Sequence, residues 1–282
     1  MSAASNTEPP QLAHRSWGRE GGAELWILHG ILGSKQNWTR FSQRLSERHP
    51  ELLVRAFDLR CHGDSVGFSS PHTVRSCAAD LIRERERLGA PSVLIGHSFG
   101  GKVALAYGAK VGTAGRPIPS LWTLDSPLES APRPGHGEVA QVIEVCARLA
   151  MPQPSRRALS EALQAEGLSA GISQWMTTNI RRAEGGFQWR FDIQGIQELM
   201  RDYWRLEAWH LLGVIPKETS LKLLRAERGM RWTEESARRL QEVAPHAQSP
   251  LLRDSGHWVH IDQPDALLAL ISEDIERLKL GQ

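Results

Sequence analysis

The sequence predicts an α/β fold, a doubly wound and mostly parallel sheet with a helical cap inserted between two of its strands. Two observations lead to this class. Short apolar runs that end at a glycine or an aspartate alternate with segments whose apolar residues recur at helical spacing. One long stretch, residues 129–216, breaks this alternation and shows no clear strand. A chain of 282 residues is long enough for one large domain with such an insertion.

Each element follows from its local pattern. Short apolar runs are typical of buried parallel strands, and they occupy residues 24–29, 52–58, 92–96, 121–125, 221–224 and the region around Leu251. Helical spacing predicts helices over residues 37–48, 74–88, 99–109, 233–243 and 264–278. Because such sheets bind ligands at the carboxyl ends of their strands, we expect the functional site at that edge.

The same pattern divides the chain into four parts. The first residues lack both the charged and the apolar region of a signal peptide, so they are expected to form a disordered tail. Within the insertion, apolar residues keep helical spacing and proline and glycine punctuate them. The predicted parts are a tail at 1–11, a first core part at 12–128, a helical cap at 129–216 and a second core part at 217–282.

Composition limits the partners. The chain has 34 Lys and Arg against 32 Asp and Glu, and no basic run interleaved with aromatic residues, so nucleic acid is not an expected partner. No apolar run reaches the length of a membrane span. The three cysteines fit no zinc or redox spacing, so we expect a reduced, cytoplasmic setting with no metal and no cofactor. The oligomeric state is left open.

Ser98 is the candidate nucleophile. It is the centre of a G-x-S-x-G motif, which places a serine hydroxyl on a strained turn between a strand and a helix. The helix that follows offers backbone donors and a favourable dipole to a developing negative charge. The alternative is a glycine-rich turn that only packs a helix on a strand. The apolar strand before the motif and the helical pattern after it favour the nucleophile.

A second turn can supply an oxyanion hole. The HG-x-x-G sequence that begins at His29 ends an earlier strand, so it aims a backbone N–H toward the same edge of the sheet. We expect the N–H groups of Ile31 and Phe99 to hold an oxyanion, each contributing roughly 10²–10³ in rate. His29 itself is expected to be a packed, hydrogen-bonded structural residue.

The base and the acid come later in the chain. His257 follows a strand candidate and a glycine, which places it on a loop at the same edge. The acid that orients it has two candidates. Asp125 ends the strand before the cap, and Glu227 follows the strand after the cap. Asp125 is favoured, although a turn-capping role is an alternative for an aspartate before Ser-Pro.

Together these motifs resemble the α/β-hydrolase superfamily, and within it the esterase group around α/β-hydrolase domain-containing protein 11 with its bacterial and plant relatives. The resemblance runs from Leu25 to the C-terminus and rests on the segments LHGILGS, FDLRCHGDS, IGHSFGGKVAL, LDSP and DSGHWVH. It implies an α/β-hydrolase fold that cleaves carboxylic esters or acyl thioesters. It also implies that four residues stabilise the loop behind the oxyanion turn, namely Asp58, Arg60, His62 and Ser65.

The resemblance bears on the acid and on the pocket. Some bacterial members place the catalytic aspartate after the strand before the cap, as Asp125 is placed. They also carry a serine at the post-cap position, where this sequence has Arg228 and Gly229. The resemblance further implies an acyl pocket that aromatic residues wall from the cap side, namely Trp175, Trp189, Phe191, Tyr203 and Trp204. The alternative is that these aromatic residues form the core of the cap.

The leading hypothesis is a cofactor-free serine esterase or thioesterase. Haloalkane dehalogenases and epoxide hydrolases need an aspartate at the elbow, where this chain has Ser98. A cofactor-free haloperoxidase, a C–C bond hydrolase, a lyase and a ligand-binding protein without turnover remain alternatives on this fold. Lys102 lies one turn into the helix after Ser98; a functional role is an alternative for it, but we expect it to lie on the helix flank and reach solvent.

Overall fold

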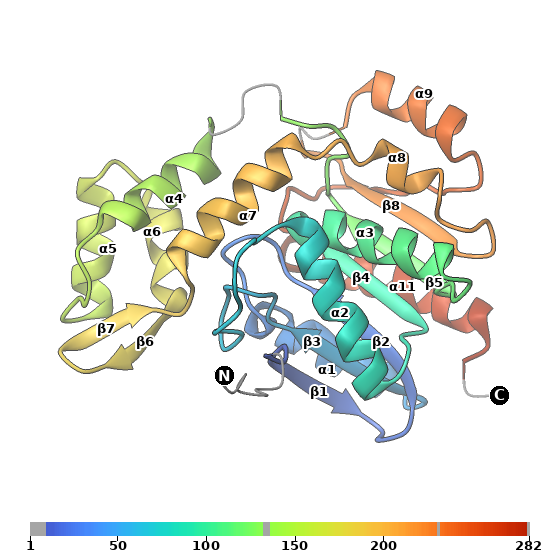
Figure 1. Cartoon of the computed structure of the whole chain (residues 1–282), viewed down its shortest axis with the longest axis horizontal. Coiled ribbons are helices and arrows are strands. Elements are labelled where there is room, and N and C mark those ends of the chain that lie inside the picture. Colours follow the sequence, from blue (N-terminus) through green and yellow to red (C-terminus); the bar gives the residue numbers. More distant parts are fainter. Residues whose placement is uncertain (1–9, 132–135, 230–231, 281–282) are drawn as a thin grey trace, which may run out of the picture.

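The computed structural model describes residues 10–131, 136–229 and 232–280, and most of the expected tail lies outside these residues. A seven-stranded sheet with strand order β1-β3-β2-β4-β5-β8-β9 forms its centre (Figure 1). Every neighbouring pair is parallel except β1 with β3. The strands are β1 (His14–Gly18), β2 (Ala23–Leu28), β3 (Leu52–Phe57), β4 (Val93–His97), β5 (Ser120–Leu124), β8 (Ser220–Ala226) and β9 (Leu251–Leu252). The predicted fold class is confirmed.

Strand β1 is the sheet element that the sequence pattern did not reveal. It lies at the sheet edge and pairs antiparallel with β3, with His14 opposite Phe57 and Gly18 opposite Leu53. Its residues are half-buried or exposed, because an edge strand buries little of its surface. The segment therefore lacks the continuous apolar run by which the six other strands were predicted.

Helices cover both faces of the sheet (Figure 1). Alternate residues of β2 point to opposite faces, as in any strand: Trp26 and Leu28 pack with α2 and α3, while Leu25 and Ile27 pack with α1 and α11. The helices of this part are η1 (Lys35–Trp38), α1 (Thr39–Arg48), α2 (Val74–Leu88), α3 (Phe99–Thr113), α9 (Glu234–Val243), α10 (Val259–Asp262) and α11 (Pro264–Leu278).

The chain between β5 and β8 forms a separate group of elements, of which all but α8 extend away from the sheet on one side, while α8 lies beside α3 (Figure 1). They are α4 (Glu138–Arg148), α5 (Arg156–Ala165), α6 (Ala170–Met176), η2 (Thr177–Asn179), β6 (Ile180–Ala183), β7 (Gly186–Trp189), α7 (Ile193–Arg205) and α8 (Trp209–Leu212). The group is mostly helical, as expected. The boundaries of a cap at 129–216 stay a prediction.

The hairpin of β6 and β7 corrects the expectation that this segment lacks strands. Its turn ends at Gly185 and β7 begins at Gly186, and the φ angles of these two glycines, 76° and 141°, lie in the region that favours glycine. A Gly-Gly pair between two short polar and aromatic runs is a hairpin signal. The strands are only four residues long, so their alternation is too short to stand out from the helices around them.

Two further observations concern the environment of the chain. Among the described residues, no helix combines the length and the apolar character that crossing a bilayer requires. The three cysteines are free and buried. The cytoplasmic location stays a prediction.

Candidate active site

Ser98 lies on a strained turn between β4 and α3. Its φ of 52° and ψ of −112° fall outside the regions that residues with side chains normally adopt. The turn is tight, because a Cβ added at Gly96 would lie 2.2 Å from the carbonyl oxygen of Gly100. Two hydrogen bonds brace it: the N–H of Ser98 donates to the Leu124 carbonyl at 3.0 Å, and Ser126 Oγ donates to the Ser98 carbonyl at 2.7 Å. This is the geometry expected of a nucleophile elbow.

His257 and Asp125 are hydrogen-bonded to one another. The distance between His257 Nδ1 and Asp125 Oδ2 is 2.7 Å. Asp125 follows β5 and is 1% exposed, and its second oxygen accepts a hydrogen bond from the N–H of Ala226 at 3.3 Å. A buried carboxylate needs such donors. With Nδ1–H directed to Asp125, Nε2 of His257 carries the lone pair that a general base requires.

The other acid candidate lies elsewhere. Glu227 is exposed, and its carboxylate accepts a hydrogen bond from the N–H of Asp254 at 2.8 Å. A Cβ added at Gly229 would lie 2.6 Å from Oδ1 of Asp125, so the glycine at this position leaves room for that carboxylate. Related proteins carry a serine near this position, and here the glycine avoids a steric clash with Asp125. The geometry favours Asp125 as the partner of His257.

Two histidines that the sequence reasoning did not assign support His257. Nε2–H of His97 donates to the backbone carbonyl of His257 at 2.8 Å, and the two rings lie 4.7 Å apart. His260 stacks on Trp38 at 4.2 Å, and burial lowers the pKa of its imidazole to about 4. His260 is thus neutral at ordinary pH. Nothing in the motif reveals the role of His97, because it occupies the variable position before the serine.

The oxyanion turn is positioned by buried histidines. His29 is 1% exposed and its Nε2 accepts the N–H of Leu59 at 3.0 Å, which confirms its structural role; burial lowers the pKa of its imidazole. His62 Nε2 accepts the N–H of Leu32 at 3.1 Å. Ile31 precedes Leu32 and lines the same cavity as Ser98 and Phe99, so both expected oxyanion donors lie at that cavity.

The loop behind this turn contains the four residues that the resemblance marked as structural. Asp58 is fully buried and accepts the N–H of Lys35 at 2.7 Å. Ser65 Oγ donates to the carbonyl of Asp58 at 2.7 Å. Arg60 forms a bidentate pair with Asp80, with N–O distances of 2.6 and 2.7 Å. These contacts hold the loop against η1 and α2 and leave its charges paired.

A cavity of about 1080 Å³ opens above Ser98. Its floor comes from the sheet edge, and its walls come partly from α4, α6 and α7. Three of the expected pocket residues line it, namely Trp175, Tyr203 and Trp204. The other two, Trp189 and Phe191, are not part of its lining in the described chain. They stack on one another with ring centroids 4.9 Å apart, next to the hairpin, where they form local core.

Lys102 does not reach solvent, contrary to expectation. It is 1% exposed, and its Nζ donates to the backbone carbonyls of Glu129, Tyr203 and Leu206 at 2.8, 3.2 and 2.7 Å. Burial lowers the pKa of its ammonium group to about 8. The expectation was wrong because the segment after β5 covers this flank of α3. Lys102 is the single charge within residues 99–109, an apolar and glycine-rich stretch, and this was the available signal.

Comparison with known sequences gives consistent results. Residues 27–270 match the model of a family described as the alpha/beta hydrolase family. The chain is 27% identical over 263 residues to the sn-1-specific diacylglycerol lipase ABHD11 of Xenopus laevis, covering 90% of this chain and 80% of the relative. It is 25% identical over 269 residues to Esterase YbfF of Escherichia coli strain K12, covering 92% and 95%. These matches confirm the resemblance inferred from the motifs.

A solved structure agrees with the fold. The marine microorganism esterase superposes with a TM-score of 0.81 at 23% sequence identity, and the match covers 94% of this chain and 99% of that chain.

Proposed function

Because the chain belongs to the alpha/beta hydrolase family, we propose that it cleaves carboxylic esters with Ser98 as nucleophile, His257 as general base and Asp125 as the acid that orients the base. The observation that carries this assignment is the 2.7 Å hydrogen bond between His257 Nδ1 and Asp125 Oδ2. The names of the relatives, which include esterases and a diacylglycerol lipase, support the ester as the substrate class.

The acylation step begins with proton transfer. Nε2 of His257 accepts the proton of the Ser98 hydroxyl as the oxygen attacks the acyl carbon of the ester. The carbonyl oxygen gains the negative charge, and the N–H groups of Ile31 and Phe99 stabilise it, together with the dipole of the 15-residue helix α3. Asp125 stabilises the imidazolium that has formed. The intermediate then collapses, and the imidazolium gives its proton to the departing alcohol.

The deacylation step repeats this chemistry with water. His257 removes a proton from a water molecule, and the hydroxide attacks the acyl group on Ser98. The same two N–H groups hold the second oxyanion. Collapse of the intermediate releases the carboxylic acid, and His257 returns the proton to the serine oxygen. His260, whose imidazole pKa burial lowers to about 4, takes no proton in either step, and His97 holds the backbone of His257 through its hydrogen bond to the carbonyl.

The lining of the cavity supports the proposal of a mainly apolar acyl group. Trp175, Tyr203 and Trp204 provide large apolar surfaces around it, and a volume of about 1080 Å³ exceeds the space of a short acyl chain. An acyl thioester has the same reacting carbon and is a second substrate of the same class.

The test is the initial rate of hydrolysis of p-nitrophenyl esters of increasing acyl length. We expect turnover in the wild type and a loss of about 10⁴-fold or more in Ser98→Ala, because no other group replaces the nucleophile. The matched control is Ser160→Ala on the helix α5, whose hydroxyl accepts a hydrogen bond from Gln164 at 3.2 Å and does not line the cavity. Turnover in Ser98→Ala within about tenfold of the wild type would contradict the proposal.

A further inference from the structure

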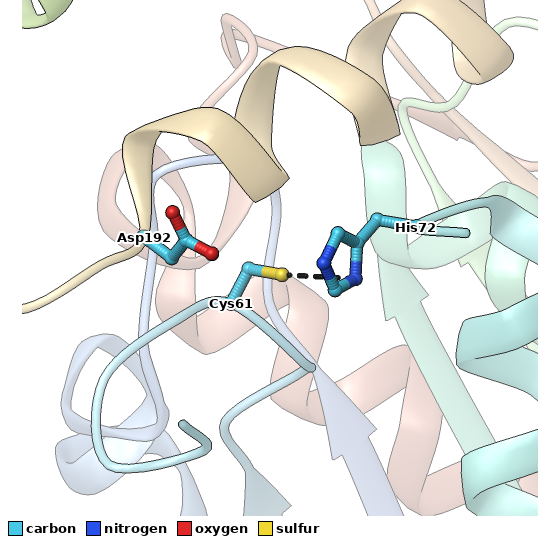
Figure 2. Close-up of side chains that lie close together, drawn as sticks. All are labelled: Cys61, His72 and Asp192. Atoms are coloured by element: carbon cyan, nitrogen blue, oxygen red, sulfur yellow. Dashed lines mark hydrogen bonds between the residues drawn. The ribbon is translucent and has the colours of Figure 1, made fainter. Parts of the chain in front are cut away.

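A second group of chemically active side chains lies outside the cavity. Cys61 lies on the loop after β3, His72 precedes α2, and Asp192 caps the N-terminus of α7 (Figure 2). One candidate ligand atom from each lies within 4.8 Å of the other two. None of the three lines the cavity above Ser98. The fold thus brings together three residues that the esterase mechanism does not use.

The three side chains face one point. Cys61 Sγ is 3.4 Å from Nδ1 of His72, and both residues are buried. One oxygen of Asp192, Oδ1, accepts the N–H of Gln194 at 3.0 Å as the helix cap. The other oxygen, Oδ2, lies 3.0 Å from the position of a Cβ added at Gly195, and Sγ lies 2.4 Å from that position. Glycine at 195 therefore keeps open the space between sulfur and carboxylate.

Protonation excludes a second nucleophile here. Burial, followed by the negative charge of Asp192, raises the pKa of the Cys61 thiol to about 12. A thiol in this state is not a reactive thiolate at neutral pH. The geometry of the group suits a cation instead, because a carboxylate oxygen and an imidazole nitrogen lie close to the sulfur, which becomes an anion when a metal displaces its proton.

We propose that Cys61, His72 and Asp192 bind a divalent cation of the zinc class. Thiolate, imidazole and carboxylate are all zinc ligands, and the combination of sulfur and nitrogen selects against magnesium and calcium. Tetrahedral zinc keeps its ligand atoms about 3.3–3.8 Å apart. The sulfur and the imidazole already have this spacing, and Asp192 is an exposed side chain that completes it by rotation. Water takes the fourth position. Binding releases the thiol proton to solvent.

The site would join two parts of the chain. Cys61 and His72 belong to the loop between β3 and α2, and Asp192 begins α7, which carries Tyr203 and Trp204 along the cavity. A backbone hydrogen bond from the Asp192 N–H to the Cys61 carbonyl at 2.9 Å already connects these parts. A metal at this point fastens the first turn of α7 to the loop and stabilises the wall of the cavity.

The experiment titrates metal into the full chain, which is first dialysed against a chelator in the presence of a phosphine reductant. Calorimetry with Zn²⁺ is expected to show one strong site and the release of about one proton per metal. Co²⁺ is expected to produce a thiolate-to-cobalt charge-transfer band. Cys61→Ser is expected to lose the band, and Asp192→Asn, which keeps a good helix cap, to weaken zinc binding by at least about tenfold.

Cys146→Ser is the control, because Cys146 is a buried free cysteine on α4 and is not part of the group. It should retain the cobalt band and the zinc affinity of the wild type. If Cys61→Ser does not fold, as judged by circular dichroism, Asp192→Asn and His72→Gln provide the same comparison. Absence of a cobalt–thiolate band in the folded wild type, or a band that Cys61→Ser and His72→Gln retain, would overturn the proposal.

Discussion

The molecule contains two sets of residues with nearly the same composition and opposite arrangements. Each combines a hydroxyl or thiol, an imidazole and a carboxylate, and the sets are Ser98, His257 and Asp125, and Cys61, His72 and Asp192. In the first set the carboxylate bonds the imidazole itself, at 2.7 Å. In the second set the imidazole approaches the sulfur at 3.4 Å, and the carboxylate faces the sulfur as well.

The difference shows that arrangement rather than residue type decides the chemistry. A carboxylate that is hydrogen-bonded to Nδ1 of an imidazole fixes the tautomer of the ring and stabilises the positive charge of the imidazolium, which suits proton transfer. A carboxylate and an imidazole that surround a protonated thiol create a position for a cation. Exposure adds to the contrast. The imidazole of His257 is one quarter exposed beside a large cavity, whereas Cys61 and His72 are buried.

The largest expected effect removes the carboxylate from the first set. Asp125→Asn should reduce kcat by ~10⁴, because the amide cannot hold the tautomer that leaves Nε2 free to accept a proton. Glu227→Gln, at the exposed alternative position, should stay within about twofold. Steady-state hydrolysis of the best p-nitrophenyl ester measures both. A large loss in Glu227→Gln with little change in Asp125→Asn would assign the role of the acid to Glu227 instead of Asp125.

A smaller effect is expected when the reactivity of the Cys61 thiol is compared with that of the Ser98 hydroxyl. In the metal-free folded chain, iodoacetamide should alkylate Cys61 about 10³-fold more slowly than a free cysteine, because a thiol with a pKa of about 12 is almost fully protonated at pH 7.5. The rate should rise about tenfold for each pH unit, since the pH stays well below that pKa. A fluorophosphonate should label Ser98 under the same conditions. Mass spectrometry of peptides reads both labels, and rapid alkylation of Cys61 would contradict the assignment of the thiol as protonated.

The smallest expected effects come from the two glycines that make room for the carboxylates. In Gly229→Ala the new methyl group meets Oδ1 of Asp125, and a displacement of about 1 Å should reduce kcat by about 10–100-fold. In Gly195→Ala it meets Cys61 Sγ, which should weaken zinc binding by a similar factor and leave kcat within a few-fold. Steady-state kinetics and zinc titration on both variants test whether Gly229→Ala changes kcat and Gly195→Ala changes zinc affinity. A loss of kcat in both variants would show that the two sets are not independent.

The sequence predicted six of the seven strands and the residues of the candidate site because their signals are local. The strand before Ser98, the glycines around it and the helix after it are consecutive, and each additional residue restricts the turn further. Asp125 and His257 were found in the same way, at the ends of apolar runs. The choice between Asp125 and Glu227 was different, because it depends on which of two strand ends lies nearer His257.

The remaining features depend on contacts between distant segments. Cys61 and His72 have no recognisable metal spacing with each other, and Asp192 lies far along the chain, so only the packing of α7 on the loop unites them. Lys102 was expected at the surface because the residues that cover it come from both ends of the segment between β5 and β8. Trp189 and Phe191 were expected at the cavity, but the hairpin directs them toward each other instead.

Lys102 also has a consequence for how the chain is assembled. The carbonyl oxygens of Glu129 and Leu206 lie at most about 5.5 Å apart, because both bond the same nitrogen at 2.8 and 2.7 Å. The chain between them therefore departs and returns at a single point, as a module inserted into a host. The entropy of closing such a loop grows only slowly with its length. A longer or shorter segment anchored to this lysine would leave the strand order of the sheet intact. One inserted segment could therefore replace another at this position.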